Sequence, residues 1–352
     1  MKKNYTHACI AVLLCITCAA FAQVTEIATT GLLNPVGVAK NGNTLFISSV
    51  GNMSIRQKDL SNTSTTDTTV FLPNFDFGVF LTFQGNDLYI PMLANNKVVK
   101  IDVTNPTAVL TDVVTNVPTP MGLAFRNNEL YISLRQDAKI VKVDLTQSNP
   151  TAVDVVTGIP GTFVNGIAFR GDELFITHGN TISKINVTDA NPVLTEVLIA
   201  NSNPVDVAFD GNFLYFSLPS DTAVARADVT QAMPVIDTFL TLPNGPWGLL
   251  IDGSDLYIAE QTGSRVVLFD LTTLSVAEAS ARRFTYYPNP TKDVLHISGL
   301  TNSTSYVLSD QQGKEIMEGT LNSTDKLDVS SVANGIYFLR LNDYEVKKIV
   351  KY

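Results

Sequence analysis

Six copies of one short segment follow one another at nearly equal spacing along this chain of 352 residues. The copies align without gaps around six shared leucines: Leu45, Leu88, Leu130, Leu174, Leu214 and Leu256. These leucines lie 43, 42, 44, 40 and 42 residues apart. A fixed period of this size is typical of repeat folds in which each unit contributes four short strands. The repeat region is therefore predicted to be all-β and to contain six such units.

Each unit shows the same order of local signals. In the second unit the apolar strand "FLTF" ends at the turn Gly85-Asn86, and the aromatic strand "LYIP" follows. Glycine and asparagine supply the positive φ angles that tight hairpins need. A third strand then ends at an acid or amide, which is Asp59, Asp102, Asp144, Asn186, Asp228 or Asp270. Because this residue recurs in every unit, we interpret it as a turn cap rather than as a site.

The two ends of the repeat region complement each other. The sixth unit stops after its third strand, "RVVLFDLT" (265–272), whereas "VTEIATTGLLNP" (24–35) is similar to the fourth-strand segment "LTEVLIANSNP" (194–204). An N-terminal strand that completes the last unit would leave no open sheet edge. The expected fold of residues 23–276 is a six-bladed β-propeller closed by this strand. The pattern resembles NHL-like repeats and the regucalcin/gluconolactonase superfamily, a likeness that fixes architecture and not activity.

A second module begins where the period breaks. The segments "YYPNPTKDVLHISG" (286–299), "LDVSSVANGIYFLRL" (327–341) and "VKKIVKY" (346–352) alternate apolar and polar residues between turns, which predicts a small C-terminal β-sandwich. Their order resembles the C-terminal sorting (Por) domain of type IX secretion cargo. The resemblance implies that residues 284–352 are read by the type IX secretion machinery and that 277–283 is a linker. An ordinary binding sandwich is the alternative.

The first 22 residues have the features of a signal peptide. Lys2 and Lys3 precede an apolar run that ends in Ala20-Phe21-Ala22. All three cysteines lie inside this segment, so the mature chain would have no thiol for a disulfide or a metal. No later stretch reaches the ~18 uncharged apolar residues of a membrane span. With the sorting resemblance, this predicts export through the periplasm to the cell surface or the medium.

The charge balance excludes one class of partner. Without Lys2 and Lys3, 22 basic side chains remain against 33 acidic ones. Nucleic-acid binding depends on the neutralisation of phosphates by Lys and Arg, so no nucleic acid is expected. Acidity of this kind mainly favours solubility.

Aligned positions near the predicted channel select five candidate ligand-binding residues. The slot before the first strand holds Asn165 and Trp247 among apolar residues. The next slot holds Asp206, where four other units have glycine. The slot four residues past the leucine holds His178 and Glu260. Because all five lie in units four to six, that side of the ring is the expected contact surface.

Two interpretations of this set stay open. In the first, the five residues line a polar pocket with Trp247 as its apolar wall, suited to a small polar or carbohydrate-like ligand, and a carboxylate beside the imidazole could serve acid–base chemistry. In the second, His178 caps a turn at Gly179-Asn180 and Asp206 accepts hydrogen bonds from loop amides. The loop after His178 is two residues shorter than in the other units, which predicts an accessible imidazole.

The regucalcin-like resemblance implies a divalent cation held by Glu, Asn and Asp side chains. Asn165 and Asp206 match two of these positions, but Val36 and Gly37 stand where the first unit would need its glutamate. Calcium takes about six to eight oxygen ligands, so these two matches do not predict a metal, and no cofactor is expected. Propellers that resemble virginiamycin lyase use His and Glu side chains. The predicted channel contains a single histidine, His178, so this resemblance is thin.

The expected function is that of a secreted or cell-surface binding or scaffold module with a carbohydrate or protein ligand. The alternative is a lactonase-like hydrolase or a lyase that acts on a sugar-derived substrate in the channel. An enzyme would need a further convergent polar or metal-bound group, which the aligned positions do not supply. We therefore expect a binding protein rather than an enzyme.

Overall fold

The computed structural model describes residues 24–75, 78–105, 107, 109–272, 285–298, 304–311, 313–322, 326–341 and 347–352. The predicted signal peptide (1–22) and the predicted linker (277–283) lie outside these residues. The chain divides into two compact units between Phe269 and Asp270. Each unit is described by itself below.

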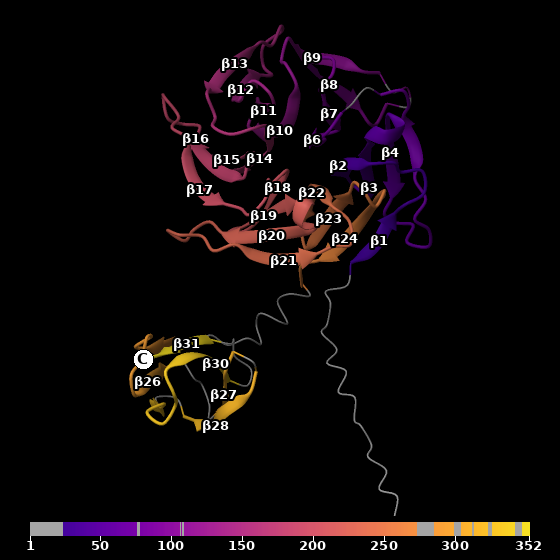
Figure 1. Ribbon diagram of the computed structural model, residues 1–352. Helices are drawn as coiled ribbons and strands as arrows, with labels where there is room; N and C mark the ends of the chain where they lie inside the picture. The colour runs from indigo at the N-terminus through magenta and orange to yellow at the C-terminus, as the bar shows by residue number, and fades with distance from the viewer. Residues whose placement is uncertain are drawn as a thin grey trace, which may run out of the picture. The chain divides into compact units, whose positions relative to one another are not determined.

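The first unit contains six four-stranded sheets that follow one another around a ring (Figure 1). We number them blades 1 to 6 along the chain. Blade 1 comprises β2 (Pro35–Asn41), β3 (Thr44–Ser49), β4 (Ser54–Asp59) and β5 (Thr69–Leu72). Blade 2 comprises β6 (Thr82–Gln84), β7 (Asp87–Met92), β8 (Lys97–Asp102) and β9 (Thr111–Thr115). Blade 3 comprises β10 (Pro120–Arg126), β11 (Glu129–Leu134), β12 (Lys139–Asp144) and β13 (Ala152–Val156).

The second half of the ring repeats this order. Blade 4 comprises β14 (Val164–Arg170), β15 (Glu173–His178), β16 (Thr181–Asn186) and β17 (Thr195–Ile199). Blade 5 comprises β18 (Val207–Asp210), β19 (Phe213–Leu218), β20 (Ala223–Asp228) and β21 (Asp237–Thr241). Blade 6 comprises β22 (Pro246–Asp252), β23 (Asp255–Glu260), β24 (Arg265–Asp270) and β1 (Thr25–Ala28). Two short 3₁₀ helices, η1 (Val50–Asn52) and η2 (Pro219–Asp221), follow the second strands of blades 1 and 5.

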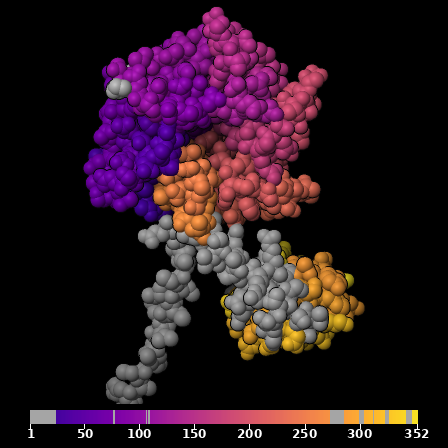
Figure 2. Space-filling view, turned by 180° about the vertical axis from the view of Figure 1, so that it is seen from behind, coloured from indigo at the N-terminus to yellow at the C-terminus, as the bar shows by residue number. Residues whose placement is uncertain are grey.

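Contacts between first strands run all the way around the ring. Each first strand contacts the first strands of the two neighbouring blades, and β22 contacts β2. At the outer edge of blade 6, β1 pairs antiparallel with β24, and Thr25 lies opposite Leu268. Figure 2 shows this neighbourhood, with the indigo start of the ring beside the orange end of blade 6. Blade 6 therefore takes strands from both ends of the repeat region.

The predicted tight hairpin turns and turn caps of the repeats are confirmed. The residue three before each shared leucine has a positive φ in all six blades: Gly42, Gly85, Asn127, Gly171, Gly211 and Gly253. At the end of each third strand the acid or amide accepts hydrogen bonds from the backbone and side chain two residues later, as Asp102 does from Thr104 at 2.9 and 2.6 Å. Asn186 makes the same pair of bonds with Thr188. These residues are turn caps.

The shared leucines fill the interfaces between blades. Leu174 and Ile176 of blade 4 pack with Tyr131 and Ile140 of blade 3 in one buried cluster, and similar clusters join other neighbouring blades. Because side chains alternate along a strand, residues two and four positions after the leucine point the same way as the leucine. The aromatic residue after the leucine points the other way, and Tyr131 meets Phe169 of blade 4 edge to face at 5.0 Å. Each blade is thus held on both faces by its neighbours.

Glycine allows first strands to approach each other closely at the ring's centre. A Cβ atom on Gly248 would lie 2.5 Å from the carbonyl oxygen of Val36 and 3.0 Å from the Cα atom of Gly37. Backbone atoms cannot yield as a flexible side chain can. Close contact between first strands of neighbouring blades therefore explains why glycine occupies this aligned position in four of the six units.

We expect Gly248→Ala to lower the free energy of unfolding by about 1–3 kcal/mol or more, because the added methyl group overpacks this contact. Urea unfolding followed by fluorescence measures the loss. Gly253→Ala is the matched control, since Gly253 has a φ of +62° and nothing within 4 Å of the added Cβ atom. It should cost about 1 kcal/mol from backbone strain alone. A smaller loss at Gly248 than at Gly253 would contradict the close-approach explanation.

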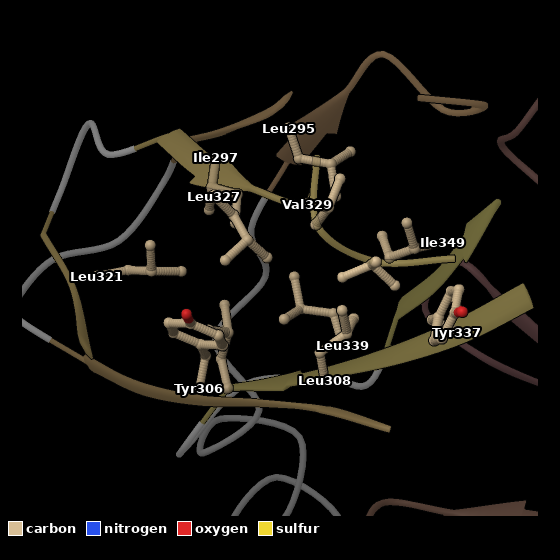
Figure 3. Packing of buried hydrophobic residues seen from close by; sticks show 12 residues of the cluster. Leu295, Ile297, Tyr306, Leu308, Leu321, Leu327, Val329, Tyr337, Leu339 and Ile349 are labelled. Atoms are coloured by element: carbon tan, nitrogen blue, oxygen red, sulfur yellow. The ribbon is translucent and has the colours of Figure 1, made fainter. Parts of the chain in front are cut away.

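The second unit consists of two sheets that share one core. One sheet contains β25 (Thr285–Tyr287), β26 (Val294–Ser298) and β29 (Lys326–Asp328). The other contains β28 (Glu315–Leu321), β27 (Thr304–Ser309), β30 (Gly335–Leu341) and β31 (Lys347–Lys351). Leu295 and Leu327 of the first sheet belong to the same buried cluster as Leu308 and Leu339 of the second (Figure 3). The alternation read from the sequence thus buries one face of each sheet.

Candidate functional site

Apolar side chains at or near the start of the first strands of four blades pack together. Val36, Val79, Phe80, Met121 and Val205 form one buried cluster, which we call the apolar plug, and Trp247 packs against it. Residues that follow the plug positions along the first strands of all six blades line a central cavity of about 210 Å³. Residues before the plug positions, with neighbouring loops, line a second cavity of about 230 Å³, which we call the mouth pocket.

The mouth pocket lies on blades 3 to 6. It is lined by Arg135, Phe163, Asn165, Asn203, Val205, Pro219, Ser220 and Trp247. The pocket forms here because first strands begin where second strands end, as Val164 pairs with His178 in blade 4 and Pro246 pairs with Glu260 in blade 6. The loops after the second strands therefore surround the entrance, as the alignment predicted.

Among the described residues that line the mouth pocket, Arg135 is the single one with a charged side chain. Its backbone amide donates to the Thr119 carbonyl at 3.0 Å, which fixes the start of the loop after β11. The guanidinium lies over the ring of Phe163, 4.3 Å from its centroid. Its Nε is buried and has no hydrogen-bond partner among the described residues. Burial lowers the pKa of Arg135.

Asn165 contributes a second unmatched polar atom. Its side chain is 6% exposed, and its Oδ1 has no hydrogen-bond partner in the described part of the chain. Its backbone carbonyl, by contrast, accepts a bond from the Ser133 hydroxyl at 2.5 Å, which anchors β14 to blade 3. A buried polar atom without a partner costs about 1–3 kcal/mol. A ligand that bonded to Asn165 would remove this cost.

Phe163 is held in an unusual backbone conformation beside Arg135. Its φ is +58°, in the left-handed region that bulky residues rarely adopt. The aligned residues Asn34 of blade 1 and Thr119 of blade 3 have φ of +50° and +45°, so the conformation recurs in the repeat, and asparagine is a residue type that tolerates it. The ring of Phe163 is 44% exposed. The structure therefore keeps a strained, exposed aromatic residue at the pocket where an asparagine would relieve the strain.

His178 is buried, so the prediction of an accessible imidazole is wrong. It is 3% exposed. Its Nδ1 lies 2.8 Å from the Pro160 carbonyl oxygen and its Nε2 lies 2.8 Å from the Ser183 hydroxyl. Because a carbonyl only accepts, Nδ1 is the protonated nitrogen and Nε2 accepts from Ser183. Burial lowers the pKa of His178, which favours this neutral form. Both ring nitrogens are therefore engaged within blade 4 and its adjoining loop.

Glu260 is also engaged. It is fully buried, and its Oε2 accepts bonds from the Nε of Arg265 and the side-chain amide of Asn244, both at 2.8 Å. Arg265 pairs in addition with Glu26 of β1, and its hydrogen bond to Glu260 is the largest cause of its raised pKa. Glu260 therefore joins β23, β24 and the N-terminal strand.

Asp206 lines the central cavity rather than the mouth pocket. Its Oδ2 accepts from the Leu249 amide of blade 6 and its Oδ1 from the Val207 amide, both at 2.9 Å. Burial raises its pKa to about 7, although these two bonds act in the opposite direction. No cluster of three or more His, Cys, Asp or Glu residues is present among the described residues. Asp206 and Asn165, the two residues that match the regucalcin-like resemblance, line different cavities and so do not converge on one divalent cation.

The structure thus brings only Asn165 and Trp247 of the five candidates into one pocket. Asp206 lines the central cavity, while His178 and Glu260 line neither cavity. The alternation of side chains explains this, because a residue four past the shared leucine points with the leucine into the blade interface. The residue five past the leucine points the other way, and that position holds Val50, Leu93, Arg135, Gly179, Pro219 and Gln261. Comparing that position would have revealed Arg135.

The C-terminal unit is identified by comparison with protein families. Residues 285–352 match the family model of the secretion system C-terminal sorting domain. This unit is a sorting domain. Its presence shows that the chain is exported by type IX secretion, to the cell surface or the medium. In the described part of the chain no helix is long and apolar enough to cross a membrane.

Solved structures resemble the region ahead of the sorting domain, whereas no curated protein matches the sequence. A gluconolactonase from Xanthomonas campestris is 12% identical, with a TM-score of 0.59, over 71% of this chain and 89% of that one. Virginiamycin B lyase from Staphylococcus aureus is 15% identical, with a TM-score of 0.53, over 71% and 99%. A nidogen/laminin complex contributes a chain at 15% identity and a TM-score of 0.55, over 65% and 89%. At such identities the likeness shows the propeller fold alone.

Proposed function

We propose that this protein is an exported binding module whose propeller holds a ligand in the mouth pocket. The supporting observation is that Arg135 and Asn165, which each carry a buried polar atom without a partner in the described structure, line the same pocket as Trp247. Pockets that bind small molecules combine an apolar wall with a few convergent polar groups. Trp247 supplies the wall, and the side chains of Arg135 and Asn165 supply the polar groups.

The second candidate is a lactonase-like hydrolase or a lyase on a sugar-derived substrate. The similarity to a gluconolactonase and to a lyase favours it at the level of the fold. Acid–base catalysis, however, needs a group within hydrogen-bond reach of the substrate. Both nitrogens of His178 are occupied, and Glu260 is buried against Arg265. Binding therefore agrees better than catalysis with the described residues.

The proposal includes a structural role for both ends of the chain. The N-terminal strand β1 closes the ring, a role supported by its pairing with β24 and by the contact of Glu26 with Arg265. The sorting domain forms a small β-sandwich, supported by the one core that its two sheets share. The propeller would then be delivered outside the cell with a closed ring that needs no disulfide.

We expect the exported protein to be stabilised by a saccharide from a glycan panel in a thermal unfolding assay. A ligand at 100 times its dissociation constant adds about 2.7 kcal/mol of stability, which is readily measured. Trp247→Ala should abolish this shift because the apolar wall is lost. Tyr287→Ala, which removes an exposed aromatic residue of the sorting domain, is the control and should preserve it. Metal-dependent turnover of a lactone by the purified protein would instead establish the enzyme.

A further inference from the structure

Arg135 differs from another arginine that the propeller places over an aromatic ring. Arg226 lies 4.9 Å from the ring centroid of Phe213, and its Nε donates to the carboxylate of Asp237 at 3.1 Å. Arg135 has the same kind of stacking on Phe163, but no described carboxylate pairs with it. The chain as a whole has a net charge of −9, so an uncompensated, half-buried guanidinium stands out. Arg135 itself lines the mouth pocket.

The stacking on Phe163 orients the guanidinium for a planar anion. A guanidinium that stacks on a ring keeps its N–H donors in the plane, where they match the two oxygens of a carboxylate. Phe163 holds this position at a positive φ, which costs stability in a bulky residue, while the aligned Asn34 and Thr119 share the same conformation. Phe163 and Arg135 thus form a preorganised pair.

The rest of the pocket suits the ring of a sugar. Trp247 offers an aromatic face, and Asn165, Asn203 and Ser220 offer hydrogen-bonding groups for hydroxyls. The cavity of about 230 Å³ is smaller than the pockets of about 300–1,000 Å³ that hold drug-sized ligands. A single saccharide unit therefore fits better than a long apolar molecule.

We infer that the mouth pocket binds an acidic saccharide, a sugar unit whose carboxylate pairs with Arg135 while its ring packs on Trp247. This inference rests on the proposed binding function and adds the ligand class. Asn165 lines the same pocket and offers a side-chain amide to the sugar hydroxyls.

Calorimetric titration of the exported protein with trigalacturonic acid and with its methyl ester tests the inference. The ester keeps the sugar rings and removes the charge. We expect the acid to bind at least about tenfold more tightly than the ester, since charge-assisted bonds to Arg135 are lost with the ester. Arg135→Gln should remove this preference, and Arg135→Lys should restore only part of it. Arg170→Gln, which removes an arginine that bonds to Asn212 outside the pocket, should change neither affinity.

The possible outcomes separate the two proposals. Equal binding of acid and ester, weakened for both by Trp247→Ala, would overturn the acidic ligand and leave the binding pocket standing. Inorganic sulfate that bound as tightly as trigalacturonic acid would show an anion site and overturn the sugar. Failure of the acid to bind overturns the inference as well, and the glycan panel then decides the proposed function independently.

Phe163→Asn adds a readout that a purely structural role would not produce. Asparagine tolerates the positive φ, so the melting temperature should be at least that of the wild type. The affinity for trigalacturonic acid should fall severalfold because Arg135 loses its orienting surface. A variant that melts lower and binds the acid as tightly as the wild type would contradict the role of Phe163.

Discussion

Replacing Arg265 by alanine should lower the free energy of unfolding by about 3–5 kcal/mol, because Glu260 would be left as a buried charge without its partner. Glu260 is fully buried, and Arg265 bonds to both of its oxygens. The loss should be measured by urea denaturation at neutral pH. It would identify Glu260 as a structural residue of blade 6 rather than a ligand of the pocket.

Two controls separate the buried pair from the exposed one. Glu26→Gln removes only the half-exposed partner on β1 and should cost less than about 1 kcal/mol. The double variant Glu260→Leu/Arg265→Leu should recover much of the stability lost in Arg265→Ala, since no unpaired charge remains. A loss below about 1 kcal/mol in Arg265→Ala would contradict the structural role of Glu260.

The free energy of unfolding should fall as the pH rises from 5 to 8, because Asp206 loses its proton in the folded protein. Its folded pKa of about 7 lies above its ordinary value of 3.8, so folding takes up a proton between these values. This contribution is complete below pH 3.8 and is lost as the pH rises through about 7. Between pH 5 and pH 8 the loss is about 3 kcal/mol. Asp206→Asn removes the titrating group, so the stability of this variant relative to the wild type should rise over that interval.

Asp228→Asn is the matched control for this pH dependence. The bonds from Thr230 lower the pKa of Asp228, so its contribution to stability is present above its ordinary pKa and disappears only as the pH falls below about 4. Asn186 shows that an asparagine makes the same turn. The difference between Asp228→Asn and the wild type should therefore stay constant from pH 5 to pH 8. A constant difference for Asp206→Asn as well would contradict the burial of an acid at this position.

Most of the fold could be predicted because the same local sequence signals recur in each of the six units. In each unit a glycine or asparagine marks the hairpin between the first and second strands, a leucine lies in the second strand, and a turn cap ends the third strand. The same strand order therefore explains all six units. The pairing of β1 with β24 followed the pattern because the sixth unit lacked a fourth strand. Leucine spacing and turn residues are local properties, so they can be read without the structure.

The site was harder to predict because it depends on which way single side chains point. His178 and Glu260 were compared at a position that shares its face with the leucine, and both bond within their own blade or its adjoining loop. Their partners, such as Pro160 for His178, come from loops whose paths the sequence pattern does not define. Arg135 stands one position further on, where alternation directs it to the mouth pocket. A comparison limited to positions whose side chains point away from the leucine would have separated Arg135 from His178 and Glu260.

The most direct test compares ligand-induced thermal shifts in two variants of the exported protein, each measured against its own baseline. Glu260→Gln alters the candidate that bonds to Arg265 within blade 6, and Trp247→Ala alters the mouth pocket. The mouth-pocket account predicts that the shift from a bound saccharide persists in Glu260→Gln and disappears in Trp247→Ala. A shift that disappeared in Glu260→Gln and persisted in Trp247→Ala would contradict it.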